Sequence, residues 1–532
     1  MSSEDRKKGL TRRDFFKRVA GGITIPYLAQ LPRFQANAGT LNDLFWVKGI
    51  PDFPFYDPES GNHHLGLDSL LYLMADSGLK FYRSSSGNWL AGPNGLIARD
   101  DVVLIKVNAQ WKYRGATNSD LIRGLIQRIL DHPDGFTGEV VIFENGQGRG
   151  SLRCDSSAAY GGETGVHANA NDESHHFLYL VNNVFKDRRV SAYLLDDIKD
   201  TFIGKTDHAK DGYRRHENVS YPCFTTAGGR RVELREGVWQ GGGHSGKLKL
   251  INVPVLKHHD TGGSEITISL KHMYGVVSMS DGQVDFRHYR GLGETCGRMM
   301  ASVCTPVLNI VDAIWVSHGS ITGYPASTTF PANQLLASQD PVAADYWAAK
   351  HILYPIDGNF RHHPDFPGIE TWLIQARETI NGLGGLLDAD KGIVVDQVTN
   401  REGEMNVRTC AAGENLQSSR ISLSRTGLFF TASSEAPWLL EKSLQLAISG
   451  SRALAWWVEK DADWLTCTPG SGWGNGEISV GVNPAGLPPG QHTGHLMIRC
   501  QDAANSPQTV AVALKIVESH RRPRGRARLK GL

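Results

Sequence analysis

The sequence lacks a dominant charge, a long apolar run and any pair of closely spaced cysteines. Its 532 residues carry a formal net charge of +1, and only 21% of them are charged. Such a balance gives no global field that would attract nucleic acid. No uninterrupted apolar run reaches about 18 residues, the length that a membrane-spanning helix needs. We therefore expect neither a nucleic-acid partner nor a stable membrane anchor.

The seven cysteines include no C-x-x-C spacing, so we expect no zinc ribbon and no iron–sulfur cluster from this chain. Because the count is odd, at least one thiol has no partner within the chain. Cys467 and Cys500 lie in the same C-terminal segment, and this is the disulfide that we favour. The sequence also lacks an H-E-x-x-H motif and a G-x-S-x-G elbow, which disfavours a zincin or a serine hydrolase.

The N-terminus resembles a twin-arginine signal peptide. Residues 10–17 read LTRRDFFK, with Arg12 and Arg13 ahead of two phenylalanines and a lysine. A weakly apolar stretch follows, and an A-x-A site predicts cleavage after Ala38. A short basic amphipathic helix is the alternative. The resemblance implies export of the folded chain by the twin-arginine translocase, and hence a periplasmic or secreted protein.

The first half of the mature chain predicts an α/β domain. Two β-branched apolar runs, at 102–107 and 139–145, flank a segment at 119–132 whose apolar residues repeat with helical spacing. This order predicts a β-α-β unit with parallel strands. Further strands are expected at 248–256, 308–316 and 333–338, and further helices at 341–353 and 368–380. The stretch 146–245 has few clear elements and is expected to form large loops.

The last part of the chain changes pattern to six short strands separated by Gly, Pro and Asn turns, which predicts an antiparallel β-sandwich of the immunoglobulin type. Trp464 is expected in the core of this sandwich, and Trp473 on its surface. The predicted organisation is a signal peptide (1–38), an α/β domain with a mostly parallel sheet (39–400), a linker (401–420), a sandwich (421–518) and a basic tail (519–532).

Five ordered segments carry a family resemblance. They read VLIKVN (103–108), NVPVLKHH (252–259), SLKHMYG (269–275), IVDAI (310–314) and SQDPVAAD (338–345). Together they resemble the family called domain of unknown function 362 over roughly residues 100–380. The chain departs from the family pattern in three ways. His272 stands where Asn is usual, His318 lies near the place of an acidic residue, and the cysteine-rich iron–sulfur module of some members is missing.

The C-terminal segment resembles the BACON domain, an immunoglobulin-like module of secreted bacterial proteins. The resemblance lies in Asp463-Trp464-Leu465, in the turn SGWGNG, in EISVGVNP and in GQHTGHLMI. It implies a carbohydrate ligand by association with the proteins that carry such modules.

Polar residues cluster where the predicted strands end, and ligands of parallel α/β sheets bind at that edge. Lysines bind anions, and histidines bind metals or transfer protons. The candidate catalytic or binding residues are Lys106, Asn108, Glu144, Lys257, His258, Lys271 and Asp312.

Several of these candidates also have a structural interpretation. Asp340 is expected to cap a helix, Asp345 to lie on a helix surface or in packing, and Asp312 could hydrogen-bond a loop. Among the twenty histidines, His258, His259 and His318 are the candidate ligands of a divalent metal. Neighbouring histidines on a strand point to opposite faces, which weighs against two ligands from one doublet.

Two functions follow from these observations. The first is an enzyme-like domain that binds a small anion or a metal cofactor through Lys106, Lys257 and His258, with Asp312 or Glu144 as acid or base. The second is a carbohydrate-binding protein that acts through the sandwich, with the α/β domain as a scaffold.

Overall fold

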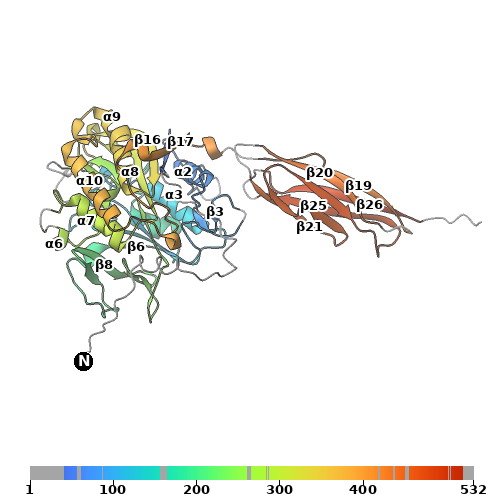
Figure 1. The fold of residues 1–532 in the computed structure, drawn as a ribbon, viewed down its shortest axis with the longest axis horizontal. Coiled ribbons are helices and arrows are strands. Elements are labelled where there is room, and N and C mark those ends of the chain that lie inside the picture. Colours follow the sequence, from blue (N-terminus) through green and yellow to red (C-terminus); the bar gives the residue numbers. More distant parts are fainter. Residues whose placement is uncertain are drawn as a thin grey trace, which may run out of the picture. The chain divides into compact units, whose positions relative to one another are not determined.

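The computed structural model has an α/β part and a β-sandwich (Figure 1). The predicted signal peptide, including Ala38, and the basic tail lie outside the described residues. The residues described are 41–56, 61–86, 88–155, 164–260, 265–282, 284, 287–416, 420–434, 438–449, 454–500, 503 and 505–518.

A ten-stranded, mostly parallel sheet organises the α/β part, as predicted. Its main path runs in the order β17 (Met405–Ala411), β1 (Asn42–Lys48), β16 (Thr329–Ser338), β15 (Leu308–Ser317), β12 (Leu248–Asn252), β4 (Val102–Lys106), β5 (Glu139–Glu144) and β6 (Val190–Leu194). Only β16 runs antiparallel to its neighbours on this path. Beside the path, β13 (Val255–His258) pairs parallel with β15 and antiparallel with β14 (Ile266–Thr267).

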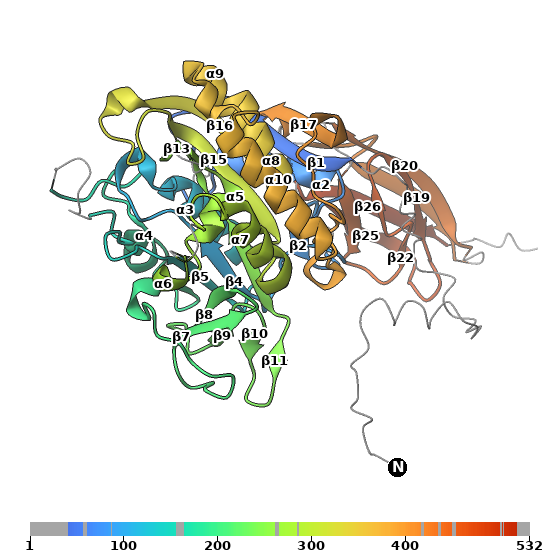
Figure 2. The same cartoon turned by 60° about the vertical axis from the view of Figure 1, so that its left-hand side comes forward.

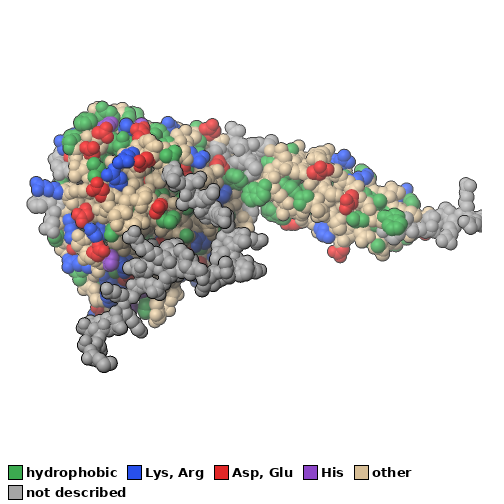
Figure 3. All heavy atoms as spheres, in the orientation of Figure 1, with side chains coloured by type: hydrophobic (Ala, Val, Ile, Leu, Met, Phe, Trp, Pro, Cys, Tyr) green, Lys and Arg blue, Asp and Glu red, His purple; other side chains and the backbone are tan. Residues whose placement is uncertain are grey.

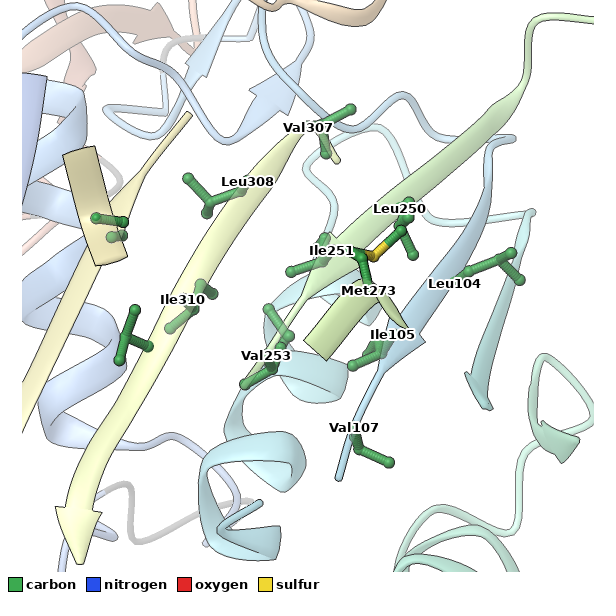
Figure 4. Packing of buried hydrophobic residues seen from close by; sticks show 14 of the residues in the cluster. Leu104, Ile105, Val107, Leu250, Ile251, Val253, Met273, Val307, Leu308 and Ile310 are labelled. Atoms are coloured by element: carbon green, nitrogen blue, oxygen red, sulfur yellow. The ribbon is translucent and has the colours of Figure 1, made fainter. Parts of the chain in front are cut away.

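The central strands are buried on both faces, which explains their continuous apolar sequence. The predicted β-α-β unit is present: β4 and β5 pair in parallel, and the helix α3 (Ser119–Leu130) connects them. Figure 4 shows apolar side chains of β4, β12 and β15, with Met273 of the helix α5 (Ser269–Tyr274) beside those of β4 and β12. This packing places the N-terminal residues of α5 close to the ends of β4 and β12.

Several helices surround the sheet (Figure 2). Asp340 caps α8 through bonds from the amides of Val342 and Ala343, and a proline follows at the first helical position, as the sequence predicts. Besides α3 and α5, the described residues form the α-helices α2 (Leu65–Asp76), α4 (Phe177–Tyr179), α6 (Met279–Gly282), α7 (Leu292–Arg298), α8 (Pro341–Ala348), α9 (Tyr354–Asp357) and α10 (Pro367–Gly382).

The stretch 146–245, expected to form loops, contains a second sheet, and that expectation was wrong. Five antiparallel strands follow β6: β7 (Gly212–His216), β8 (Val219–Thr225), β9 (Arg231–Glu233), β10 (Gly237–Trp239) and β11 (His244–Ser245). Three of them have three residues or fewer, too short for a clear alternation of apolar and polar side chains. A small parallel pair, β2 (Tyr82–Arg83) and β3 (Ala91–Gly92), lies earlier in the chain.

The C-terminal part is a sandwich of two sheets, as predicted. One has the order β18 (Arg420–Leu423), β20 (Leu440–Ser449), β24 (Gly476–Val482) and β22 (Leu465–Thr468). The other has the order β19 (Gly427–Ser433), β26 (Gln508–Val517), β25 (Gly490–Arg499), β21 (Ala455–Lys460) and β23 (Ser471–Trp473). All pairs are antiparallel except β19 with β26.

The tryptophans of the sandwich differ from the prediction in one respect. Trp456, not Trp464, is the tryptophan buried in the core, where its indole N–H donates to the carbonyl of Gly474 at 3.0 Å. Trp464 is only partly buried against that core. Trp473 has 58% of its surface exposed, as expected.

Two further expectations require correction. No disulfide joins Cys467 and Cys500 in the part of the chain that the structure describes. Cys467 belongs to β22 of one sheet, whereas Cys500 directly follows β25 of the other. The predicted linker 401–420 contains β17, which pairs in parallel with β1 of the large sheet.

The surface agrees with the balanced composition. Figure 3 shows positive and negative side chains mixed over the visible face of the α/β part. Within the described residues, no helix is both long enough and apolar enough to span a membrane.

Candidate functional site

The candidate site lies where β4, β5 and β12 end. Lys106 closes β4, Glu144 closes β5, and Asn252 closes β12 in register with Lys106. The helix α5 adds Lys271 and His272 to the same edge. The structure thus brings together polar side chains from four elements, as expected for the carboxyl ends of parallel strands.

Lys106 has a complete set of acceptors. Its Nζ lies 2.7 Å from Oε1 of Glu144, 2.9 Å from the carbonyl of Val107 and 3.2 Å from Nε2 of His272. An ammonium has three N–H donors, so these partners use all of them. Burial lowers the pKa of Lys106, and the carboxylate of Glu144 opposes that shift. Lys106 is therefore an organising residue that holds two strands and α5 together.

His272 extends this cluster into the sheet. Its Nδ1 lies 2.7 Å from Oδ1 of Asn252, whose amide donates to Oδ1 of Asn309 at 2.9 Å. With a proton on Nδ1 as donor, Nε2 is free to accept from Lys106. Burial lowers the pKa of His272 well below its usual value, which keeps the ring neutral. His272, which stands where the family resemblance places Asn, thus accepts a hydrogen bond from Lys106.

Lys257 and Lys271 have far fewer partners. Lys257 Nζ donates to the carbonyl of Gly115 at 2.7 Å, and Lys271 Nζ lies 2.6 Å from Nε2 of His288. Both side chains are buried, and neither forms an ion pair within the described residues. Burial lowers the pKa of each lysine to about 7. The carboxylate of Glu144 opposes this shift at Lys257, and Cys296, Asp260 and Glu265 oppose it at Lys271.

Two histidines accompany these lysines. The ring of His288 stacks on Tyr274 with centroids 5.0 Å apart, and meets the ring of His259 edge-on at 5.4 Å. Burial, followed by the charge of Lys271, lowers the pKa of both histidines. Neutral imidazoles can donate or accept a hydrogen bond without adding positive charge.

A separate chain of polar contacts begins at His258. Its Nδ1 lies 3.0 Å from Nε2 of His362, whose Nδ1 lies 3.3 Å from Oδ1 of Asp357. His318 approaches the same carboxylate at 3.6 Å. His258 and His318 are thus linked through two residues that the sequence did not single out as ligands, although His362 belongs to a histidine doublet.

The predicted metal ligands do not gather at one point. His258 faces His362, whereas its neighbour His259 faces His288. In the part of the chain that the structure describes, none of His258, His259 and His318 belongs to a group of three or more residues whose ligand atoms all lie within 4.8 Å of one another. Alternation of side chains along β13 accounts for the divergence.

Asn108 and Asp312 hold neighbouring segments in place. Oδ1 of Asn108 accepts from the amide of Val255 at the start of β13. Asp312 is fully buried and accepts from the amides of Asn118 and Ile314 at 2.7 and 3.1 Å. Burial raises the pKa of Asp312 to about 7. Asp312 therefore anchors the start of α3. This agrees with the structural interpretation in the sequence analysis, in which Asp312 hydrogen-bonds a loop.

Asp345 positions α5. It is fully buried on α8, and its two oxygens accept from the amides of Ser269 and Leu270 at 2.7 and 3.0 Å. These amides open α5, so the carboxylate caps the helix that carries Lys271 and His272.

His288 was missed because it lies in a segment without helical or strand periodicity, and no sequence signal marks it.

The comparisons with known families agree with this organisation. Residues 248–350 match the family described as "Domain of unknown function (DUF362)", and residues 420–511 match the "Viral BACON domain". Both resemblances are confirmed over these ranges: the α/β part contains a DUF362 segment, and the sandwich contains a BACON-type module. No curated protein matches the chain in sequence.

Solved structures resemble small parts of the chain. The Bacteroides ovatus GH5 xyloglucanase in complex with a XXXG heptasaccharide is 14% identical, covers 19% of each chain and has a TM-score of 0.16. PapD-like domain 7 of human CEP192 is 15% identical over 19% of this chain and 88% of that domain, with a TM-score of 0.17. The E. coli chaperone DraB is 7% identical over 19% and 57%, with a TM-score of 0.16. The chain spans about a fifth of the xyloglucanase, and these similarities carry no functional argument.

Proposed function

We propose that the α/β domain binds a small anionic ligand, through a phosphate or carboxylate group, between Lys257 and Lys271. One observation carries the proposal: both ammonium groups are buried, and each has a single hydrogen-bond partner among the described residues. Each lysine thus has N–H donors left over. Burying a charge without a counter-charge is costly, and a bound anion offsets that cost.

The other candidates then have supporting roles. Glu144 neutralises Lys106 and accepts from the amides of Ala109 and Asn145, so we assign it to the framework instead of acid–base chemistry. Asp312 has the same kind of role at α3. His259 and His288 lie beside Lys271 as neutral rings, and they are the groups we propose to hydrogen-bond the ligand.

Calorimetric titration with sulfate and with inorganic phosphate tests this proposal. Lys257→Met and Lys271→Met each remove a charged hydrogen bond worth about 1.5–3 kcal/mol, so we expect affinity to fall roughly tenfold or more. Lys249→Met is the matched control, because Lys249 is equally buried on β12 but lies toward the start of that strand. Equal binding by wild type and by both site variants would refute the proposal.

A second candidate function is glycan binding by the sandwich. Trp473 is 58% exposed, and it pairs with Ala455 on β21. Because side chains alternate along a strand, Trp457, two residues after Ala455, lies on the same face as Trp473. The indole of Trp457 donates to Glu459, which pairs with Arg499. Aromatic rings next to polar side chains suit sugar rings, which have both apolar faces and hydroxyl groups.

Affinity electrophoresis of the whole chain in gels containing different polysaccharides tests glycan binding. We expect Trp473→Ala to remove the retardation that the wild type shows. Trp438→Ala is the control, because Trp438 is 74% exposed and lies outside this pair. Retardation that is the same in all three proteins would place any glycan site elsewhere.

A further inference from the structure

We infer that His208, Glu233 and His244 form a binding site for a divalent transition-metal ion, Zn²⁺ being the best match. One ligand atom from each residue lies within 4.8 Å of the other two. Nε2 of His244 lies 3.3 Å from Oε2 of Glu233, yet it is buried and forms no hydrogen bond. A buried nitrogen without a hydrogen bond beside a carboxylate is suited to a cation between them.

The second sheet brings these residues to one face. Glu233 on β9 pairs with Gly237 on β10, and Trp239 on β10 pairs with His244 on β11. Because side chains alternate along a strand, Glu233, Trp239 and His244 point to the same side. The loop before β7 supplies His208, whose ring stacks on Trp239 with centroids 4.0 Å apart and planes 5° apart.

Gly237 makes this arrangement possible. Its φ of +106° is a backbone conformation that favours glycine, and a Cβ atom there would lie 2.1 Å from the carbonyl oxygen of Ser245. The absence of a side chain lets β11 approach β10 closely and leaves space beside Glu233. The residue next to Ser245 is His244, so the close approach also fixes the position of that ligand.

The ligand set indicates the kind of metal. Two imidazoles and one carboxylate are the protein ligands of many catalytic zinc sites, where a fourth position stays open for water or substrate. Tyr221 donates to Oε1 of Glu233 at 3.2 Å, and Arg214 pairs with Oε2. Such outer contacts orient a ligating carboxylate. The charge of Arg214 also repels a cation, so we expect weaker affinity than in closed structural zinc sites.

This site is independent of the proposed anion site and of the ligands His258, His259 and His318 that the sequence suggested. Its two histidines, His208 and His244, belong to none of the histidine doublets and lie in the stretch 146–245 that was expected to form loops. No sequence signal marks this site, because the spacing of residues 208, 233 and 244 matches no metal motif.

Titration of the whole chain with Zn²⁺ alone, after chelator treatment and dialysis, tests the inference. We expect one Zn²⁺ per chain, with at least tenfold weaker affinity in His208→Ala and in His244→Ala. His167→Ala is the matched control: His167 stacks on Tyr113 at 4.4 Å and pairs with Glu173 at 2.7 Å, but it belongs to no metal-ligand group within the described residues. Its binding should equal that of the wild type.

Fluorescence gives a second measurement. Co²⁺ bound to His208 should quench Trp239, so the quenching should disappear in Trp239→Phe and in His208→Ala. If His244→Ala does not fold, His208→Ala decides alone, because His208 is a partly exposed loop residue. A wild type that binds no Zn²⁺, or His208→Ala that binds as well as the wild type, would overturn the inference.

Discussion

At the scale of the residue, the three lysines of the site differ in their acceptors. The ammonium group of Lys106 has three hydrogen-bond acceptors, and that of Lys257 has one. The difference separates a lysine that maintains the fold from one that has donors available for a ligand. The same substitution should therefore have different consequences at the two positions.

Lys106→Met should destabilise the protein strongly. It leaves the buried carboxylate of Glu144 without its counter-charge, a change that typically costs about 3–5 kcal/mol. Lys249→Met should cost less, about 1–3 kcal/mol, because Lys249 donates to the carbonyl of Asp390 and not to a carboxylate. Urea unfolding followed by circular dichroism measures both. Equal losses would contradict the organising role of Lys106.

The affinity for sulfate should fall as the pH rises above about 7. Burial lowers the pKa of Lys257 and of Lys271 to about 7, whereas a bound anion favours their charged forms, so binding above that pH takes up protons. The groups that face them are Glu144, Lys106, Asp260, Glu265, Cys296, His259 and His288. Sulfate itself does not titrate in this range, and calorimetry in buffers of different ionisation enthalpy measures the proton uptake.

The lowered pKa values of Lys257 and Lys271 also make the stability of the protein depend on pH. Above pH 7 the unfolded chain keeps these two lysines protonated up to their ordinary pKa near 10.5, whereas the ligand-free native chain does not. Their contribution to stability therefore increases between pH 7 and about 10, since the unfolded state binds more protons there. Lys257→Met should flatten this part of the pH profile; an unchanged profile would contradict the shift.

At the scale of the element, α5 depends on a neighbouring helix for its cap. Asp345→Ala removes the acceptor of two amides at the start of α5, which should cost about 1–3 kcal/mol. Because Lys271 lies on this helix, the affinity for sulfate should also fall. Thermal unfolding and calorimetry measure the two effects.

Asp388→Ala provides the control for that experiment. Asp388 also caps a short helical turn, by accepting from the amide of Lys391, but that turn is Ala389–Lys391 and not α5. We expect a modest loss of stability and unchanged sulfate affinity. A comparable loss of affinity in both variants would show that Asp345 acts through general stability.

The sequence predicted the elements with strong periodicity. The strands β4 and β5 and the helix α3 were expected because β-branched runs and helical spacing leave few alternatives. The cap at Asp340 was expected from the Asp-Pro pair. The short strands of the second sheet were missed, and so was β17, because its polar composition resembles that of a linker.

The site was predictable only in part, for a similar reason. Lys106 and Glu144 end their strands and Lys257 lies next to the end of its strand, and parallel strands bring their ends together. The partners that complete the site come from irregular or distant segments: His362 reaches His258 across 104 residues. Sequence spacing carries no information about such contacts without knowledge of the tertiary fold.

At the scale of the whole molecule, we propose that the chain is exported by the twin-arginine translocase. Replacing Arg12 and Arg13 with lysine should leave the full-length protein in the cytoplasm of a bacterium that has this pathway. Arg18→Lys, which lies outside the pair, should leave export unchanged. Cell fractionation and the mass of the mature N-terminus after Ala38 measure the outcome. Export of the double variant at the wild-type level would refute the proposal.

The parallel pairing of β1 with β17 has a consequence for the order of folding. Asn42 is opposite Met405 in this pair, so one of the first strands to leave the ribosome gains this neighbour only after more than 350 further residues have been made. Until then β1 is the edge strand in place of the largely exposed β17, and its residues 44–47, buried in the finished sheet, favour association with other chains. A nascent chain therefore needs protection for most of its synthesis, and premature termination before residue 405 should yield a protein prone to aggregation.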